Sequence, residues 1–368
     1  MIATRPAISS QLVGPIASSH QKSSTAATFN KKMLAALAQI TLGFAALSGG
    51  SLRAPQSSSS SSSSRSAVSA IEMATRGVVI TGGAAGVGYA YADVLVREGH
   101  WVVICDVKPC DTAVDAIRKK HEGGIGKIFG TACDVSKAED VEKLGQFAKE
   151  SIGTIHYWIN NAGINGGRRP FTTLSTSTVE AVVRVNLIGV LLCTKVALDL
   201  LQQQNGVTSH IFNTVGSGVK GGGTPGYACY GATKRGLPQL TDSLVAELTK
   251  GVPGFDVEKP KGNVNVHTLS PGMVFTQLLL DDSTPELRKF PFGVLAAQPD
   301  EVAEDLVPKI LSVSGNGKKV EFLTQDRVLK KFFGKFILGE KSEYIDDDGN
   351  VIKKPGQQYD DIGVAKQY

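Results

Sequence analysis

The stretch VVITGGAAGVG, residues 78–88, predicts how this chain begins its fold. Its first four residues are β-branched, which is typical of a buried parallel strand. Four glycines follow, and a helical pattern runs from Tyr89 to Arg97. A glycine-rich turn between a strand and a helix brings backbone close to a pyrophosphate, which the unpaired N–H groups of the helix N-terminus can bind. The stretch therefore predicts a dinucleotide site, with these contact residues: Thr81, Gly82, Gly86, Val87 and Gly88.

A second predicted strand, residues 101–105, ends at Asp106, 18 residues after Gly88. A carboxylate at about this distance takes the adenosine ribose hydroxyls, and it also repels the 2′-phosphate of NADP(H). The turn provides no basic residue for that phosphate. NAD(H) is therefore favoured over NADP(H), although Lys108 stands two residues away and could reach a phosphate. The alternative for Asp106 is that it only caps the end of a strand.

Tyr230 and Lys234 stand four residues apart, and Ser217 precedes the tyrosine by thirteen residues. On a helix, positions i and i+4 share a face. We expect the Lys234 ammonium to stabilise the phenolate and to lower the pKa of Tyr230 from its ordinary value of about 10. The Ser217 hydroxyl would hold the oxygen of a carbonyl or alcohol substrate. The three side chains predict proton transfer beside a hydride transfer.

In their order along the chain, these features resemble the short-chain dehydrogenase/reductase family over about residues 74–323. The shared marks are the TGxxxGxG turn at 81–88, Asp134-Val135, Asn160-Asn161-Ala162-Gly163, Asn186, Ser217, Tyr230, Lys234, and Pro271-Gly272 with Thr276. The resemblance implies a reductase or dehydrogenase that interconverts a carbonyl and an alcohol with NAD(P)(H).

The resemblance also implies further roles within the site. Asp134 and Val135 would contact the adenine. Asn161, Ala162 and Gly163 would line the cofactor groove, and Pro271, Gly272 and Thr276 would meet the nicotinamide. Lys234 would bind the ribose hydroxyls. Asn186 would hold a water molecule in a proton relay, and the alternative for it is a buried polar group of a helix.

Within this family, four stretches are similar to the chlorophyll b reductase subgroup: HYWINNAG at 156–163, HIFN at 210–213, YGATKRG at 230–236 and LSPGMV at 269–274. The likeness implies reduction of the formyl group of chlorophyll b to a hydroxymethyl group inside a plastid. That subgroup resembles NADPH users, with a basic residue in the glycine turn, where this chain has Ala85. The alternatives are an alcohol dehydrogenase or ketoreductase for another bulky apolar substrate, and a non-catalytic, cofactor-binding scaffold protein.

Composition and patterning predict three regions. Residues 1–73 form a leader that is rich in serine and, up to residue 71, free of acidic residues, as in an organelle transit peptide. This favours a plastid, with a mitochondrion or an unaddressed disordered tail as alternatives. Residues 74–323 alternate strand and helix patterns, which predicts an α/β, Rossmann-type doubly wound parallel sheet in a single domain. Residues 324–368 form a C-terminal extension.

The remaining patterns concern partners. The net charge of +5 belongs to the basic leader, which gives no case for nucleic acid, and the scattered cysteines and histidines predict no metal site. Substrate contacts are expected from residues 164–171, 216–226 and the apolar run 273–292. That run suggests a bulky hydrophobic substrate, with ordinary packing or a dimer contact as the alternative.

Residues 327–338 predict a basic amphipathic helix in the C-terminal extension. It would lie on a membrane surface or, as we favour, cover its own domain or a partner subunit. A hairpin is expected at 344–352, because Asp348-Gly349 is a strong turn signal. We also expect a homo-oligomer.

Overall fold

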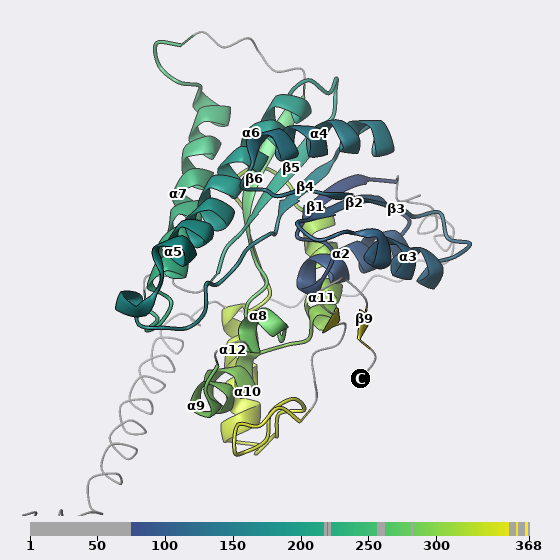
Figure 1. Cartoon of the computed structure of the whole chain (residues 1–368). Helices are drawn as coiled ribbons and strands as arrows, with labels where there is room; N and C mark the ends of the chain where they lie inside the picture. The colour runs from purple at the N-terminus through teal and green to yellow at the C-terminus, as the bar shows by residue number, and fades with distance from the viewer. Residues whose placement is uncertain are drawn as a thin grey trace, which may run out of the picture. The chain divides into compact units, whose positions relative to one another are not determined.

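The predicted first strand, β1 (Gly77–Thr81), lies inside a sheet of seven parallel strands in the order β3-β2-β1-β4-β5-β6-β7 (Figure 1). The others are β2 (Trp101–Asp106), β3 (Lys127–Ala132), β4 (Tyr157–Asn160), β5 (Thr208–Thr214), β6 (Asn263–Ser270) and β7 (Lys319–Glu321). The chain reverses its direction across the sheet between β1 and β4. The predicted doubly wound sheet is confirmed.

This computed structural model describes residues 75–216, 219, 222–255, 262–280 and 283–352, and the backbone of 358–359 and 365–366. The predicted leader, residues 1–73, and the predicted catalytic residue Ser217 lie outside the described residues. Residues Ile71–Tyr368 belong to a single structural unit.

Helices cover both faces of the sheet because its strands are apolar on both faces. Val78 and Ile80 pack in one core with α2 (Gly86–Arg97), α3 (Asp111–Lys120) and α11 (Pro299–Leu311). Val79 packs in the other core with α4 (Ala138–Ile152) and α6 (Gly189–Leu201). The same face also carries α5 (Thr176–Val183) and α7 (Ala228–Lys250) (Figure 1). Successive strand residues thus point into opposite cores, as a buried parallel strand requires.

One helix differs from its prediction. The pattern predicts a continuous helix over 176–204, but a turn of π-helix, η2 (Arg184–Ile188), separates α5 from α6. Such single π turns are often found at functional sites. Asn186 lies in this turn and is fully buried.

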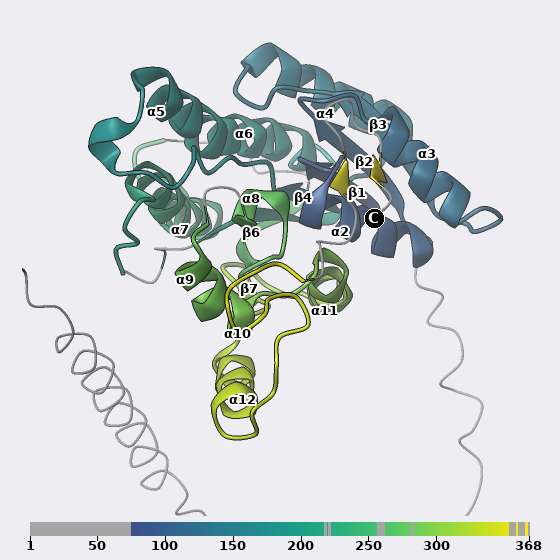
Figure 2. The same cartoon turned by 60° about the horizontal axis from the view of Figure 1, so that its bottom comes forward.

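The apolar run 273–292 and the C-terminal extension pack together. The run contains α8 (Gln277–Leu280), α9 (Pro285–Leu287) and η3 (Arg288–Phe292), and α10 (Gly293–Leu295) follows it. Figure 2 shows α10 beside α12 (Gln325–Phe336). An antiparallel bridge between Ile345 and Val351 closes the hairpin predicted at 344–352, and Ile345 packs with Phe275 and Phe292.

Two shorter features complete the fold. A 3-10 turn, η1 (Phe171–Thr173), precedes α5, and β8 (Gln358–Tyr359) pairs with β9 (Ala365–Lys366) as an antiparallel pair.

Candidate active site

The glycine turn after β1 lies against the loop that follows β4. The Thr81 hydroxyl accepts the N–H groups of Asn161 and Ala162 at 3.0 and 3.1 Å. The Asn161 side chain donates in turn to the carbonyl oxygens of Thr81 and Gly82, at 3.0 and 3.1 Å. The two predicted halves of the cofactor groove therefore meet between β1 and β4, at the point where the strand order reverses and open α/β sheets bind ligands.

Glycine is required at two positions of this turn. A Cβ at position 88 would lie 2.3 Å from the Gly82 carbonyl oxygen, and one at position 82 would lie 2.8 Å from the Ala162 Cα. Ala85 precedes α2 without a side-chain cap, so the first amides of the helix are left for an anion. Val87 packs partly buried against the core. A Cβ at position 86 would lie 3.5 Å from the Thr276 Cγ2, which places Thr276 beside the glycine turn.

The predicted adenosine end is formed by the residues after β2 and β3. The Asp106 carboxylate accepts the N–H groups of Ala84 and Lys108, both at 3.3 Å, and burial raises its pKa. This carboxylate is therefore held at the glycine turn, where a ribose would lie. Asp134 accepts two hydrogen bonds from Ser136, at 3.0 and 2.7 Å. The Val135 side chain is buried in the core.

Tyr230 and Lys234 lie in the first turns of α7, beneath the carboxyl end of β5. Lys234 is almost fully buried, and its Nζ donates to the Thr214 carbonyl oxygen at 3.0 Å. The same Nζ lies 5.9 Å from the centre of the Tyr230 ring. A Cβ at position 216 would lie 2.3 Å from the Tyr230 hydroxyl oxygen. The backbone directly before Ser217 therefore touches the predicted proton donor.

The expected effect of Lys234 on Tyr230 is wrong for this structure. Burial raises the pKa of Tyr230 to about 12, with the neighbouring Tyr227 adding to the rise. Burial also lowers the pKa of Lys234 to about 8. The desolvation of both groups outweighs the attraction between ammonium and phenolate, since burial always disfavours the charged form. The phenol is thus neutral near pH 7, in the state that can donate a proton.

Asn186 connects the predicted groove to Lys234. Its side chain accepts the N–H of Ile164 at 2.9 Å and donates to the Ile164 carbonyl oxygen at 2.7 Å. It also donates to the Thr233 hydroxyl at 3.4 Å. A Cβ at position 163 would lie 3.1 Å from the Asn186 Oδ1 and 3.5 Å from the Lys234 Nζ. Asn186 thus fixes the turn that follows β4. This is the role of a buried polar group of a helix, which was the alternative to holding a water molecule in a proton relay.

Pro271 and Gly272 follow β6, as predicted. Pro271 is buried, and Gly272 has a φ of 75°, which favours glycine. A Cβ at position 272 would lie 2.7 Å from the Leu323 side chain. This turn leads the chain from β6 to Thr276, beside the glycine turn of α2.

Sequence reasoning missed the groups that support the catalytic residues. Thr214 supplies the carbonyl oxygen that holds Lys234, and the Thr233 hydroxyl donates to the Tyr230 carbonyl oxygen at 2.7 Å. A buried polar network also joins the strand ends to the helices, because the Asn160 side chain donates to Thr194 and to Asn213, at 2.9 and 2.8 Å. The signal for that network was an asparagine near the carboxyl end of each of two strands, Asn160 in β4 and Asn213 in β5.

The three predicted substrate segments contact one another. The Asn165 side chain donates to the Leu278 carbonyl oxygen at 2.7 Å, which joins residues 164–171 to the apolar run 273–292. The Arg169 N–H donates to the Gly226 carbonyl oxygen at 3.2 Å, which joins them to residues 216–226. The described parts of these segments form a continuous rim, which we call the substrate rim.

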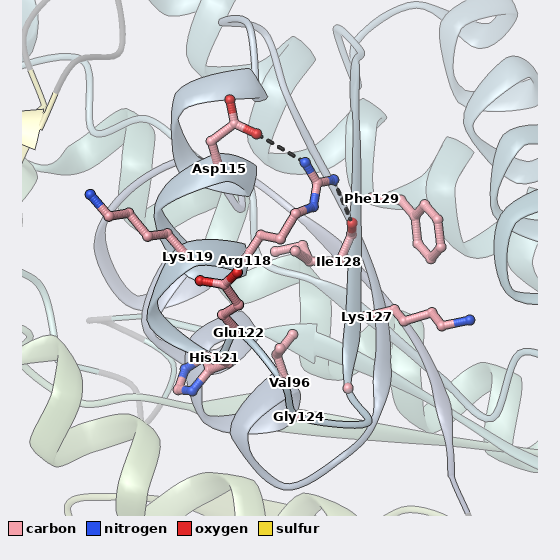
Figure 3. A pocket seen from close by; sticks show the side chains of 12 residues that line it. Val96, Asp115, Arg118, Lys119, His121, Glu122, Gly124, Lys127, Ile128 and Phe129 are labelled. Carbon is pink, nitrogen blue, oxygen red and sulfur yellow. Dashed lines mark hydrogen bonds and ion pairs between the residues drawn. The ribbon is translucent and has the colours of Figure 1, made fainter.

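A hollow of about 580 Å³ lies elsewhere, between α3 and β3 (Figure 3). Arg118 crosses it and is satisfied by the Asp115 carboxylate at 2.9 Å and the Ile128 carbonyl oxygen at 3.5 Å. No predicted site residue lines this hollow, so it is separate from the candidate active site.

Comparison with known proteins agrees with this geometry. The family profile described as "short chain dehydrogenase" matches residues 76–286. The chain is 39% identical over 280 residues to "Chlorophyll(ide) b reductase NOL, chloroplastic" of Arabidopsis thaliana, which covers 74% of this chain and 77% of that relative. It is 37% identical over 294 residues to "Probable chlorophyll(ide) b reductase NYC1, chloroplastic" of the same plant, which covers 75% of this chain. The match spans only 56% of that longer relative.

Solved structures share the fold. The crystal structure of levodione reductase is similar with a TM-score of 0.57 and 25% identity, over 67% of this chain and 95% of that one. A 3-ketoacyl-(acyl-carrier-protein) reductase from Brucella melitensis, complexed with NADH, has a TM-score of 0.55 and 25% identity over 67% of this chain and 96% of that one. The chain belongs to the short-chain dehydrogenase/reductase family.

Proposed function

We propose that this chain reduces the formyl group of a chlorophyll b-type pigment to a hydroxymethyl group. The observation that carries the proposal is its identity of 37 to 39% with chlorophyll(ide) b reductases over three quarters of its length. Within residues 273–292, Phe275 and Phe292 are buried against the hairpin, whereas Leu278 at the substrate rim is exposed and suits an apolar substrate. We further propose that the protein works in a plastid, since those relatives are named chloroplastic.

The reduction adds a hydride to the formyl carbon and a proton to the formyl oxygen. A bound nicotinamide would supply the hydride. Ser217 would donate a hydrogen bond to the formyl oxygen, and the neutral phenol of Tyr230 would give it the proton. Lys234 would hold the ribose hydroxyls and attract the phenolate that is left, and Asn186 would keep the loop after β4 in place beside it.

We propose NADH as the preferred cofactor. The support is the Asp106 carboxylate, which the amides of Ala84 and Lys108 hold at the glycine turn. A 2′-phosphate at that point would meet its negative charge.

The test uses protein without residues 1–70, chlorophyll b and its free acid chlorophyllide b as substrates, and NADH or NADPH. We expect a hydroxymethyl product with NADH. The Tyr230→Phe variant should lose turnover by at least about 100-fold, because it lacks the acidic proton, and should keep its affinity for the cofactor. Turnover of simple aldehydes without pigment turnover would favour a general ketoreductase. Cofactor binding with no turnover of any carbonyl compound would favour a scaffold protein.

A further inference from the structure

The loop that carries Arg168 has a defined conformation. The Asn165 side chain accepts the Gly167 N–H at 2.8 Å and donates to the Leu278 carbonyl oxygen. Gly166 and Gly167 have φ values of 74° and 81°, which favour glycine. A Cβ at position 166 would lie 2.6 Å from the Val182 side chain. The turn therefore holds Arg168 at a fixed place on the substrate rim.

Arg168 packs across Gly226, at one end of the segment 216–226. A Cβ at position 226 would lie 2.7 Å from the Arg168 Cγ, so the glycine leaves the room that the arginine occupies. At the other end of the same segment, Gly216 touches the Tyr230 hydroxyl. The segment thus has the proton donor at one end and a guanidinium at the other.

The Arg168 side chain is half-buried, and no carboxylate pairs with its guanidinium within the part of the chain that the structure describes. Its Nε is buried without a hydrogen-bond acceptor. Among the other described arginines, Arg97, Arg118 and Arg327 pair with carboxylates, whereas the Nε of Arg288 is also buried without an acceptor. Withdrawing a cation from water without a counter-charge costs free energy. An anion that binds the Arg168 guanidinium would offset that cost.

The proposed pigment offers one such anion. A free-acid pigment carries a propionate carboxylate on the pyrrole ring diagonally opposite to the ring that bears the formyl group, while the esterified pigment carries no charge there. A guanidinium binds a carboxylate through two parallel hydrogen bonds. Resting on the function proposed above, we propose that Arg168 binds the propionate carboxylate of the substrate and selects free-acid pigment over its ester.

The test measures kcat and KM of the full chain for chlorophyllide b and for its methyl ester. The two substrates share the macrocycle and differ in charge. We expect wild type to favour the free acid by about 10- to 100-fold in kcat/KM, the range of a hydrogen bond to a charged group. Arg168→Gln should raise KM for the free acid and leave the ester unchanged, so the preference disappears. Arg168→Lys should restore part of it. Arg169→Gln, which alters the exposed neighbour, should act as wild type.

The outcomes separate this inference from the proposed function. If wild type reduces both pigments equally, or if Arg168→Gln slows both equally, the function stands and the carboxylate contact is wrong. If wild type reduces neither pigment, the proposed function fails, and the pair 4-carboxybenzaldehyde and its methyl ester decides whether Arg168 recognises a carboxylate. Equal effects of Arg168→Gln on that pair would overturn the contact as well.

Discussion

Gly216 shows how closely the backbone approaches the reacting group. Because an added Cβ would lie 2.3 Å from the Tyr230 hydroxyl oxygen, Gly216→Ala must move that hydroxyl or the strand end. We expect kcat to fall by at least about 100-fold, since small displacements of reacting groups have effects of this size. Cofactor affinity, measured by fluorescence titration, should change little. Gly231→Ala, which lies on the same helix as Tyr230, is the matched control, because nothing lies within 4 Å of a Cβ at that position. Equal activities of the two variants would contradict this account of the site.

Asp106 allows a second test at the scale of one residue. Asp106→Asn removes the charge and keeps an acceptor for one of the two amides, because Ala84 and Lys108 donate to different carboxylate oxygens. The ratio of kcat/KM for NADH to that for NADPH should therefore fall by roughly 10- to 100-fold. Asp111→Asn, an exposed carboxylate at the start of α3, should leave this ratio unchanged. If wild type already prefers NADPH, Asp106 does not repel the 2′-phosphate.

The positions of Tyr230 and Lys234 could be predicted from the sequence, but the pKa values could not. Helical spacing is local and places the two side chains on one face of α7. Burial depends on β5, Gly163 and Asn186, which come from distant parts of the chain. Desolvation by these neighbours raises the pKa of Tyr230, and no pattern near residue 230 reports it.

Histidines form a chain of neutral rings across the central strands. Gly77 donates its N–H to the His156 Nδ1 at 3.0 Å, and Lys318 donates its N–H to the His267 Nδ1 at 3.2 Å. His267 can then only donate from Nε2, which lies 3.0 Å from the His210 Nδ1. In each ring, Nδ1 is thus an acceptor. A proton placed there would break an existing hydrogen bond.

Burial accordingly lowers the pKa of His156 and of His210 to about 4, and that of His267 to about 3, with nearby positive charges adding to the effect. Free histidine titrates at about 6.5, so between pH 6.5 and 4 the unfolded chain binds protons that the native chain does not. The stability contributed by the neutral rings is complete above pH 6.5 and is lost as the pH falls through this window. At pH 5 the loss reaches at most about 2 kcal/mol for each histidine.

The measurement is the free energy of unfolding in urea at pH 7.5, 6.5 and 5.5. We expect it to fall with decreasing pH, and the fall should be shallower in His267→Gln, although that variant is less stable throughout. A fall of equal steepness in the variant and wild type would show that other groups set the acid limit.

At the scale of elements, the strands predicted at 78–81 and 101–105 and the helix predicted from 89 to 97 match β1, β2 and α2 to within a few residues, because continuous apolar runs and 3.6-residue periods are local signals. The π turn at 184–188 was missed, since its residues fit a regular α-helix. Its cause is tertiary, because Asn186 must reach the backbone of Ile164. The packing of the hairpin against Phe275 and Phe292 also could not be predicted from local sequence patterns.

The outer face of α5 and α6 bears on the oligomeric state of the protein. In the part of the chain that is described, one helical run, Thr176–Leu201, is apolar and long enough to cross a membrane, with a mean hydropathy of 1.9 and 39% buried. It packs on α4 and on the sheet, as a core helix does. Ile188 and Leu191 remain 38% and 41% exposed on its outer face. A second copy of the chain would cover them, in line with the homo-oligomer expected from the sequence.

We predict that Leu191→Glu breaks this assembly into monomers, because it places a charge in an apolar contact. Light scattering coupled to size-exclusion chromatography would give the mass of each form. Ile125→Glu alters a more exposed apolar residue in the loop between α3 and β3 and should keep the wild-type mass. A monomeric wild-type protein would remove the case for this interface.

The strand order separates the residues proposed for the adenosine from those proposed for the substrate along the chain, which bears on how such a protein can evolve. Residues proposed to grip the adenosine, 82–135, all precede β4, and those proposed to meet the nicotinamide and the pigment follow it. In the sheet, the two halves meet where β1 pairs with β4, with Val78, Val79 and Ile80 opposite Tyr157, Trp158 and Ile159. Next to the sheet, α2 of the first half packs on α11 of the second half. A single genetic recombination near residue 160 would therefore exchange the part of the site that selects NADH or NADPH and would keep the part that binds the pigment.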